Sequence, residues 1–212
     1  MSFILDSIFP KKCFGCNKEG VYFCPKCLNS LESNSPKLGR MDLLEGSLSL
    51  FPYKTLIKKA IKSIKYEFTT DIVKYFSTIC ANTITNDYPH LLKYWQKNNF
   101  TIIPIPLHNN RENWRGFNQS TLLGKQISRK LKLNFYDELI IRSVNTIPQV
   151  KLKQKTGRLK NMKNVFSLNS ESKKIINKNI ILFDDVATTR STLNSALKTI
   201  NYQNCWFLTI AG

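Results

Sequence analysis

Apolar residues follow two different patterns along the chain. Short, nearly continuous apolar runs, typical of buried strands, occur at 47–53, 100–107, 138–142, 179–183 and 205–211. Elsewhere, apolar residues recur every three or four positions, as on one face of an amphipathic helix, at 25–33, 56–64, 72–83, 122–131 and 189–200. Such strands alternating with helices predict an α/β domain with a parallel sheet covered on both faces.

Pro36 and Gly39, in the stretch NSPKLG, interrupt this pattern and predict a linker. We therefore expect an N-terminal unit at 1–35 and a main domain at 40–212. With 212 residues and 42% hydrophobic content, the chain can bury one ordinary core and carry a small appendage. No apolar run approaches the ~18 residues of a membrane helix, and no basic segment precedes the apolar N-terminus, so we expect a cytoplasmic protein.

The N-terminal unit contains four of the six cysteines, as two CxxC pairs in CFGCNKEGVYFCPKC: Cys13, Cys16, Cys24 and Cys27. Four thiolates complete the tetrahedral coordination that zinc prefers and leave no open position, so we predict a structural zinc site. Two disulfides would require secretion, and a redox CxxC would not need to be duplicated. Cys80 and Cys205 lie in apolar patterns and are predicted core residues.

The charge of the chain is strongly unbalanced. Lys and Arg number 32 against 14 Asp and Glu, which gives a net charge of +18. Such an excess favours polyanionic ligands, for example pyrophosphates or nucleic acid, although many of these lysines can equally be solvated surface residues. The densest basic run contains no acid and comprises Lys151, Lys153, Lys155, Arg158, Lys160 and Lys163.

The most specific chemistry lies in NIILFDDVATTRSTLNSAL, at 179–197. Asp184 and Asp185 end a predicted strand, and hydroxyl side chains then open a predicted helix. Hydroxyls and unpaired backbone amides can enclose a phosphate, while carboxylates can bind vicinal sugar hydroxyls or Mg²⁺. The combination fits a ribose 5-phosphate. An N-capped helix after a strand is the simpler alternative, but it needs only one such residue. Neither GxxxxGK[ST] nor GxGxxG occurs in the chain.

A hydrophobic strand, two acids and a threonine-rich loop resemble the phosphoribosyltransferases of type I fold, which bind phosphoribosyl pyrophosphate (PRPP). Over essentially the whole chain the sequence is similar to the ComF family of competence-associated proteins. The resemblance rests on the four cysteines, on IPIPLHNNRENWRGFNQS at 103–120, on PQVKLKQKTGRLKNMKNVF at 148–166 and on the loop at 184–192.

This resemblance implies binding of PRPP with Mg²⁺ and transfer of its phosphoribosyl group to an unknown acceptor, with Asp184 and Asp185 catalytic. The residues implied to bind the 5-phosphate are Ala187, Thr188, Thr189, Arg190, Ser191 and Thr192. Arg111 and Arg115, which follow a predicted strand end, would bind the pyrophosphate; the alternative is that they are surface cations at the start of a helix. The run with Lys151, Lys153, Lys155 and Arg158 would form a mobile lid or contact DNA. The alternative is a non-catalytic protein that handles single-stranded DNA with a competence helicase and uses the PRPP site as a sensor or scaffold.

One residue departs from the family's loop. Arg190 stands where the family has a glycine, and glycine permits positive φ and close approach to a phosphate. The arginine either adopts an ordinary helical conformation or distorts the phosphate loop, and it could add a cation to the site.

Overall fold

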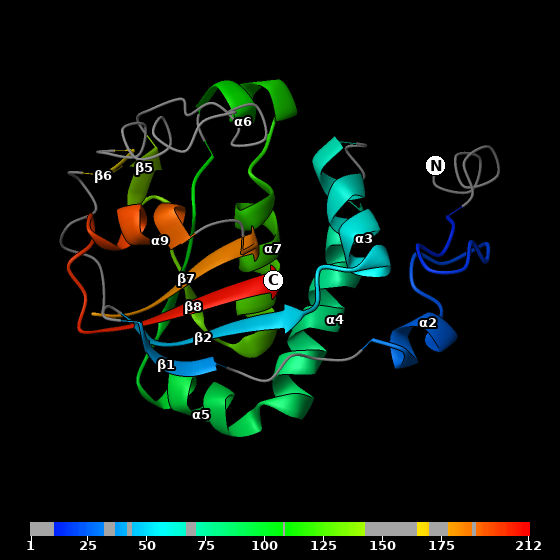
Figure 1. The fold of residues 1–212 in the computed structure, drawn as a ribbon, viewed down its shortest axis with the longest axis horizontal. Coiled ribbons are helices and arrows are strands. Elements are labelled where there is room, and N and C mark those ends of the chain that lie inside the picture. The colour runs from blue at the N-terminus through cyan, green and yellow to red at the C-terminus, as the bar shows by residue number, and fades with distance from the viewer. Residues whose placement is uncertain are drawn as a thin grey trace.

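The computed structural model describes residues 11–31, 37–41, 44–66, 71–107, 109–142, 165–169, 178–187 and 190–212, and at 37–41, 109–111 and 190–191 it describes the backbone. Within these ranges a six-stranded sheet forms the centre of the molecule, in the order β1-β2-β8-β7-β3-β4 (Figure 1). Its strands are β1 (Lys37–Met41), β2 (Leu44–Phe51), β3 (Thr101–Pro104), β4 (Asn134–Phe135), β7 (Asn179–Val186) and β8 (Asn204–Ala211). The pairs from β2 to β4 are parallel, and β1 pairs antiparallel with β2.

Alternation of side chains along β7 supplies a hydrophobic core on each face of the sheet. Ile181 and Phe183 join the core formed with α3 (Thr55–Tyr66), α4 (Asp71–Asp87), α5 (Pro89–Lys97) and α7 (Gln119–Leu131). Ile180 and Leu182 join the core formed with α9 (Arg190–Leu197) and the two-stranded sheet of β5 (Ile140–Arg142) and β6 (Phe166–Leu168). Figure 1 shows these two groups on opposite sides of the strands. The α/β fold with five parallel strands confirms the fold class predicted from the sequence.

The N-terminal unit packs against this domain through aromatic side chains. The ring of Phe23 stacks on that of Phe76 in α4, with centroids 5.5 Å apart. The Tyr22 hydroxyl donates to the Asp71 carboxylate at 2.8 and 2.9 Å. Phe23 belongs to the same core as α3 and α4, so the unit that begins the chain shares the core of the main domain. Its helix is α2 (Pro25–Asn29).

Most predicted elements occur, with four differences. Gly39, assigned to a linker, lies within β1, because the chain at Lys37–Met41 pairs with β2. The helix predicted at 25–33 ends at Asn29. The strand predicted at 138–142 belongs to the separate antiparallel pair, not to the parallel sheet. The short elements α5, α6 (Asn109–Arg115), β4 and β6 were not predicted.

Cys80 and Cys205 are buried, as predicted for core residues. Burial raises the pKa of the Cys80 thiol strongly and that of the Cys205 thiol to about 12, so both are neutral thiols at physiological pH. In the part of the chain that the structure describes, no helix is long and apolar enough to cross a membrane.

Candidate functional site

The acidic pair lies at the carboxyl end of β7, a central strand with β3 on one side and β8 on the other. In a parallel sheet this edge is where loops and helix N-termini meet ligands. Here α7 begins at Gln119 and α9 at Arg190. The sequence therefore places both carboxylates where an α/β protein of this topology binds its ligand.

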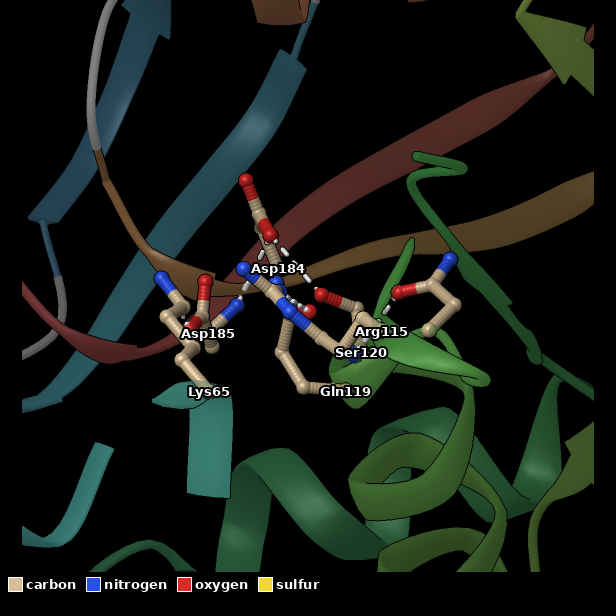
Figure 2. Close-up of polar contacts among 7 residues, drawn as sticks. Lys65, Arg115, Gln119, Ser120, Asp184 and Asp185 are labelled. Atoms are coloured by element: carbon tan, nitrogen blue, oxygen red, sulfur yellow. Dashed lines mark hydrogen bonds and ion pairs between the residues drawn. The ribbon is translucent and has the colours of Figure 1, made fainter. Parts of the chain in front are cut away.

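Asp185 is buried and paired. Only 2% of its surface is exposed, and its Oδ2 lies 2.5 Å from Nζ of Lys65 in α3 (Figure 2). The Lys65 side chain is itself largely buried, since its relative exposure is 19%. An ammonium at this distance pairs with the buried carboxylate and fixes it in one orientation.

Asp184 is partly exposed and has a different environment. Its Oδ1 accepts hydrogen bonds from the Ser120 hydroxyl and from the Asp185 backbone amide, each at 2.9 Å (Figure 2). Burial, with the neighbouring Asp185 charge, raises the pKa of Asp184 to about 7, although Lys65 and Ser120 oppose the shift. The two adjacent carboxylates therefore differ. Asp185 is paired with the Lys65 ammonium, whereas the charge of Asp184 is not fully compensated at neutral pH.

The RGFNQ motif leads into α7 and forms its start beside the acidic pair. Asn118 caps the helix, since its Oδ1 accepts from the Ser120 amide at 2.9 Å while its Nδ2 donates to the Ile105 carbonyl at 3.2 Å. Gly116 takes a φ of +77°, a turn conformation that favours glycine. These contacts fix the position of Ser120 and therefore its bond to Asp184.

Arg115, predicted to bind pyrophosphate, is buried beside the same helix start. Its Nη1 donates to Oε1 of Gln119, and its guanidinium carbon lies 5.6 Å from the centre of the Tyr66 ring. Tyr66 follows Lys65 at the end of α3. Arg115 thus connects the end of α3 with the start of α7 beside the acidic pair.

The structure describes the predicted phosphate loop in part. Ala187 follows β7, is exposed and donates its amide to the Ala211 carbonyl at 2.8 Å. Arg190 and Ser191 open α9, and Thr192 lies in its first turn. Of the two conformations expected for Arg190, the backbone adopts the ordinary helical one. Thr188 and Thr189 lie outside the described residues.

The remaining predicted contacts are less fully described. The backbone of Arg111 lies in α6, before Arg115. Four predicted lid or DNA residues lie outside the described residues: Lys151, Lys153, Lys155 and Arg158. Their proximity to the acidic pair stays a prediction.

Lys65 and Ser120 were not predicted as site residues. Ser120 is the last residue of the motif at 103–120 and lies two residues after the N-cap Asn118, so its place in the first turn of a helix beside the motif was a usable signal. Lys65 is one of several lysines on α3 and has no distinguishing sequence feature. Only the packing of α3 against the sheet shows that it faces Asp185.

The four N-terminal cysteines converge as predicted. The sulfur atoms of Cys13, Cys16, Cys24 and Cys27 all lie within 4.8 Å of one another, and all six cysteines of the chain are free of disulfides. A Cβ at Gly15 would lie 2.5 Å from Sγ of Cys27, so the first knuckle requires glycine to let the backbone approach this sulfur. This cluster could hold a metal ion such as zinc.

No family model matches this chain. It is similar to "Competence protein F" of Haemophilus influenzae, with 39% identity over 187 residues, which cover 88% of this chain and 76% of that protein. It is 28% identical to "Competence protein ComFC" of Bacillus subtilis over 201 residues, covering 89% and 77% of the two chains. A 92-residue segment is 38% identical to "DNA utilization protein YhgH" of Escherichia coli O157:H7, covering 43% of this chain and 39% of that protein.

The fold and site define an α/β protein with a five-stranded parallel sheet, an acidic pair at a strand end and a four-cysteine module, a combination consistent with a phosphoribosyltransferase-like domain. The similarity over most of both chains identifies it further. The chain belongs to the competence protein F family.

Proposed function

We propose that this protein binds PRPP with Mg²⁺ at the end of β7 and transfers the phosphoribosyl group to an acceptor as part of DNA uptake. The observation that carries the proposal is the unequal environment of the acidic pair. Lys65 compensates Asp185, whereas the pKa of Asp184 is raised to about 7. Ionised Asp184 therefore favours a ligand that donates hydroxyl hydrogens or brings a cation.

The carboxylate oxygens of Asp184 suit either a ribose hydroxyl or Mg²⁺. Both hydrogen bonds that the structure describes for Asp184 use Oδ1, so Oδ2 is the atom to meet a ribose hydroxyl or Mg²⁺. Carboxylate oxygens together with substrate phosphates are the usual ligands of Mg²⁺. Bound Mg²⁺ would supply charge neutralisation at the pyrophosphate. Asp184 and Asp185 would hold the ribose while positive charge develops at its anomeric carbon and the bond to pyrophosphate breaks.

The phosphate groups have proposed partners on both sides of the acidic pair. The turn at 187–192 would bind the 5-phosphate, because unpaired amides at the start of α9 attract anions. Arg115 and Arg111 would bind the pyrophosphate, and the lysines at 151–155 with Arg158 would close over it. Arg115 would need to exchange part of its contact with Gln119 for phosphate oxygens, which form stronger, charge-assisted bonds.

A second candidate function is DNA handling without phosphoribosyl transfer. It is favoured by the names of the relatives, which concern competence and DNA utilization, and by the net charge of +18. In this case PRPP would be sensed at the acidic pair, and a competence helicase would be the partner on single-stranded DNA. The two candidates share the site and differ in whether pyrophosphate is released.

We also propose that the four-cysteine cluster holds one Zn²⁺ with a structural role. Cys13, Cys16, Cys24 and Cys27 supply four thiolates, and the cluster lies against α3 and α4, away from solvent on that side. A metal with four protein ligands has no position for a substrate.

The test is calorimetric titration of the protein with PRPP in the presence and absence of Mg²⁺. We expect magnesium-dependent binding that is lost in Asp184→Asn and Asp185→Asn. Asp87→Asn, the same change at an exposed position at the end of α4, is the matched control and should bind as the native protein does. Pyrophosphate release with an added acceptor distinguishes transfer from sensing. Absence of PRPP binding by the native protein would refute both functions of this site.

A further inference from the structure

The outer face of α3 is an uncompensated basic surface. Lys54, Lys58, Lys59 and Lys62 are exposed, and no Asp or Glu occurs from 46 to 66. With other described residues these four lysines form no ion pair. The opposite face of the helix is apolar and buried in the core. Among the described residues, these four ammonium groups therefore face solvent without a paired carboxylate.

Exposed tyrosines mark both ends of this basic face. Tyr53, just before α3, is 44% exposed, and Tyr66, its last residue, is 55% exposed. Nζ of Lys58 lies 6.0 Å from the centre of the Tyr53 ring, and the Arg115 guanidinium lies 5.6 Å from that of Tyr66. Each exposed ring thus has a cation beside it, so the same surface offers aromatic faces and positive charges to a ligand.

We propose that the outer face of α3 binds single-stranded DNA, with its lysines on the phosphates and its two tyrosines stacking on bases. Lys54, Lys58 and Lys62 are spaced four residues apart, so they rise in steps of about 6 Å along one side of the helix. That spacing lets one extended strand meet them at successive phosphates. A row of cations with aromatic platforms is the usual composition of a single-strand binding surface, and the platforms require unpaired bases.

The surface leads to the acidic pair. Tyr66 follows Lys65, whose ammonium pairs with Asp185, and Tyr66 contacts Arg115 at the end of α6 (Figure 2 shows Lys65, Arg115 and both aspartates). In Figure 1, α3 lies on the same side of the sheet as α4 and α7. A strand bound along α3 would thus bring one end to the candidate PRPP site.

This inference rests on the DNA-handling part of the proposed function and is independent of phosphoribosyl transfer. It places the DNA-binding surface on α3, whereas the sequence indicated the basic run at 151–163. The two locations make different predictions, because substitutions on α3 leave that run intact.

The test measures binding of a fluorescent oligo(dT) of about 15 nucleotides, a length within the range of single-strand binding sites, by anisotropy over a series of salt concentrations. The α3 variant carries Lys54→Gln, Lys58→Gln and Lys62→Gln, the three lysines of this row; glutamine removes the charge and has a helix propensity close to that of lysine. We expect roughly tenfold weaker binding by this variant. The slope of log K against log salt should also be smaller by about 2, because each phosphate contact on a single strand contributes about 0.7 and three contacts are removed.

The matched control removes the same charge from other exposed helix positions, as Lys93→Gln, Lys97→Gln and Lys130→Gln. It should bind with nearly native affinity. Both variants should retain the native far-ultraviolet circular dichroism, because the substituted side chains are exposed. If both variants lose affinity equally, bulk charge explains the binding and the α3 assignment is overturned.

A second substitution tests stacking. Tyr53→Leu keeps an apolar side chain but removes the ring, and we expect affinity for oligo(dT) to fall roughly 5- to 140-fold, the range of one stacking platform. A duplex of equal length should bind more weakly than the single strand. Unchanged affinity in Tyr53→Leu, or equal binding of duplex, would overturn the proposal. Failure of the native protein to bind oligo(dT) would refute DNA handling as well, whereas binding that survives in the α3 variant refutes only this surface.

Discussion

Asp184→Asn and Asp185→Asn should change stability in opposite directions, although the residues are adjacent and the chemical change is the same. The pKa of Asp184 is raised from 3.8 to about 7, chiefly by burial and then by the Asp185 charge. Ionisation of Asp184 therefore costs folding free energy at neutral pH. Asparagine removes this cost and keeps an oxygen that can accept from Ser120 and from the Asp185 amide.

The raised pKa also determines how the contribution of Asp184 to stability changes with pH. Between about pH 4 and 7 the folded protein binds more protons at Asp184 than the unfolded chain, so its contribution to stability falls as pH rises through this window. The shift corresponds to an upper limit of about 4 kcal/mol, at about 1.4 kcal/mol per pKa unit. Because Asp184 is partly exposed, we expect Asp184→Asn to stabilise the ligand-free protein by about 2 kcal/mol at pH 8 and by nearly nothing at pH 4.

Asp185→Asn should destabilise instead. The Lys65 ammonium, 19% exposed, would lose the carboxylate that lies 2.5 Å away. Breaking a fully buried pair costs about 3–5 kcal/mol, and the partial exposure of Lys65 lowers our expectation to about 1–3 kcal/mol.

Urea unfolding of both variants and the native protein at pH 4, 6 and 8, without ligand, checks this prediction, and equal m-values verify that the same surface is exposed on unfolding. The reasoning is refuted if Asp184→Asn is no more stable than the native protein at pH 8, or if its stabilisation does not decline toward pH 4.

Three further predictions concern the cysteine cluster, the phosphate turn and the site lysine. Cys24→Ser should release the metal and loosen residues 11–31, and Gly15→Ala should weaken metal binding because its new methyl group would meet Sγ of Cys27. Elemental analysis of chelator-free preparations measures both, and native protein without zinc would contradict the site. Arg190→Gly should weaken PRPP binding by roughly 1–3 kcal/mol if the side chain contacts phosphate, and should tighten it if the arginine impairs the turn. Calorimetry measures both effects, and an unchanged affinity would show that Arg190 is not part of the site. Lys65→Met should lower the urea midpoint at neutral pH by leaving Asp185 unpaired, and an unchanged midpoint would show that the pair contributes nothing to stability.

The parallel sheet and the acidic pair could be predicted because both depend on local sequence. The run at 179–183 is apolar at every position after Asn179, as a strand buried on both faces must be, and the acids follow it directly. The cysteine spacing was equally informative, since ligand geometry constrains it. In each case the signal lies within about ten to twenty residues of sequence.

The elements that were missed depend on contacts distant in sequence. β1 forms by pairing with β2 in a stretch whose Gly39 resembles a linker, and β4 is only a two-residue edge strand beside β3. α5 begins at Pro89 directly after α4 and is only 9 residues long, so its apolar face is short and is easily read as part of the preceding helix or of a loop. The Lys65–Asp185 pair joins residues 120 positions apart on two elements, and no local pattern indicates it.

The docking of the cysteine unit on α4 has a consequence for the life of the protein in the cell. Phe23 and Phe76 stack in one continuous core. If loss of a bound metal unfolded the cysteine unit, part of the core of the main domain would therefore become exposed as well. A chain shortened to begin after residue 35 would expose Phe76, and with it a surface open to aggregation and proteolysis. If the cluster holds zinc as proposed, zinc would therefore also stabilise the main domain, including α3, whose Lys65 pairs with Asp185.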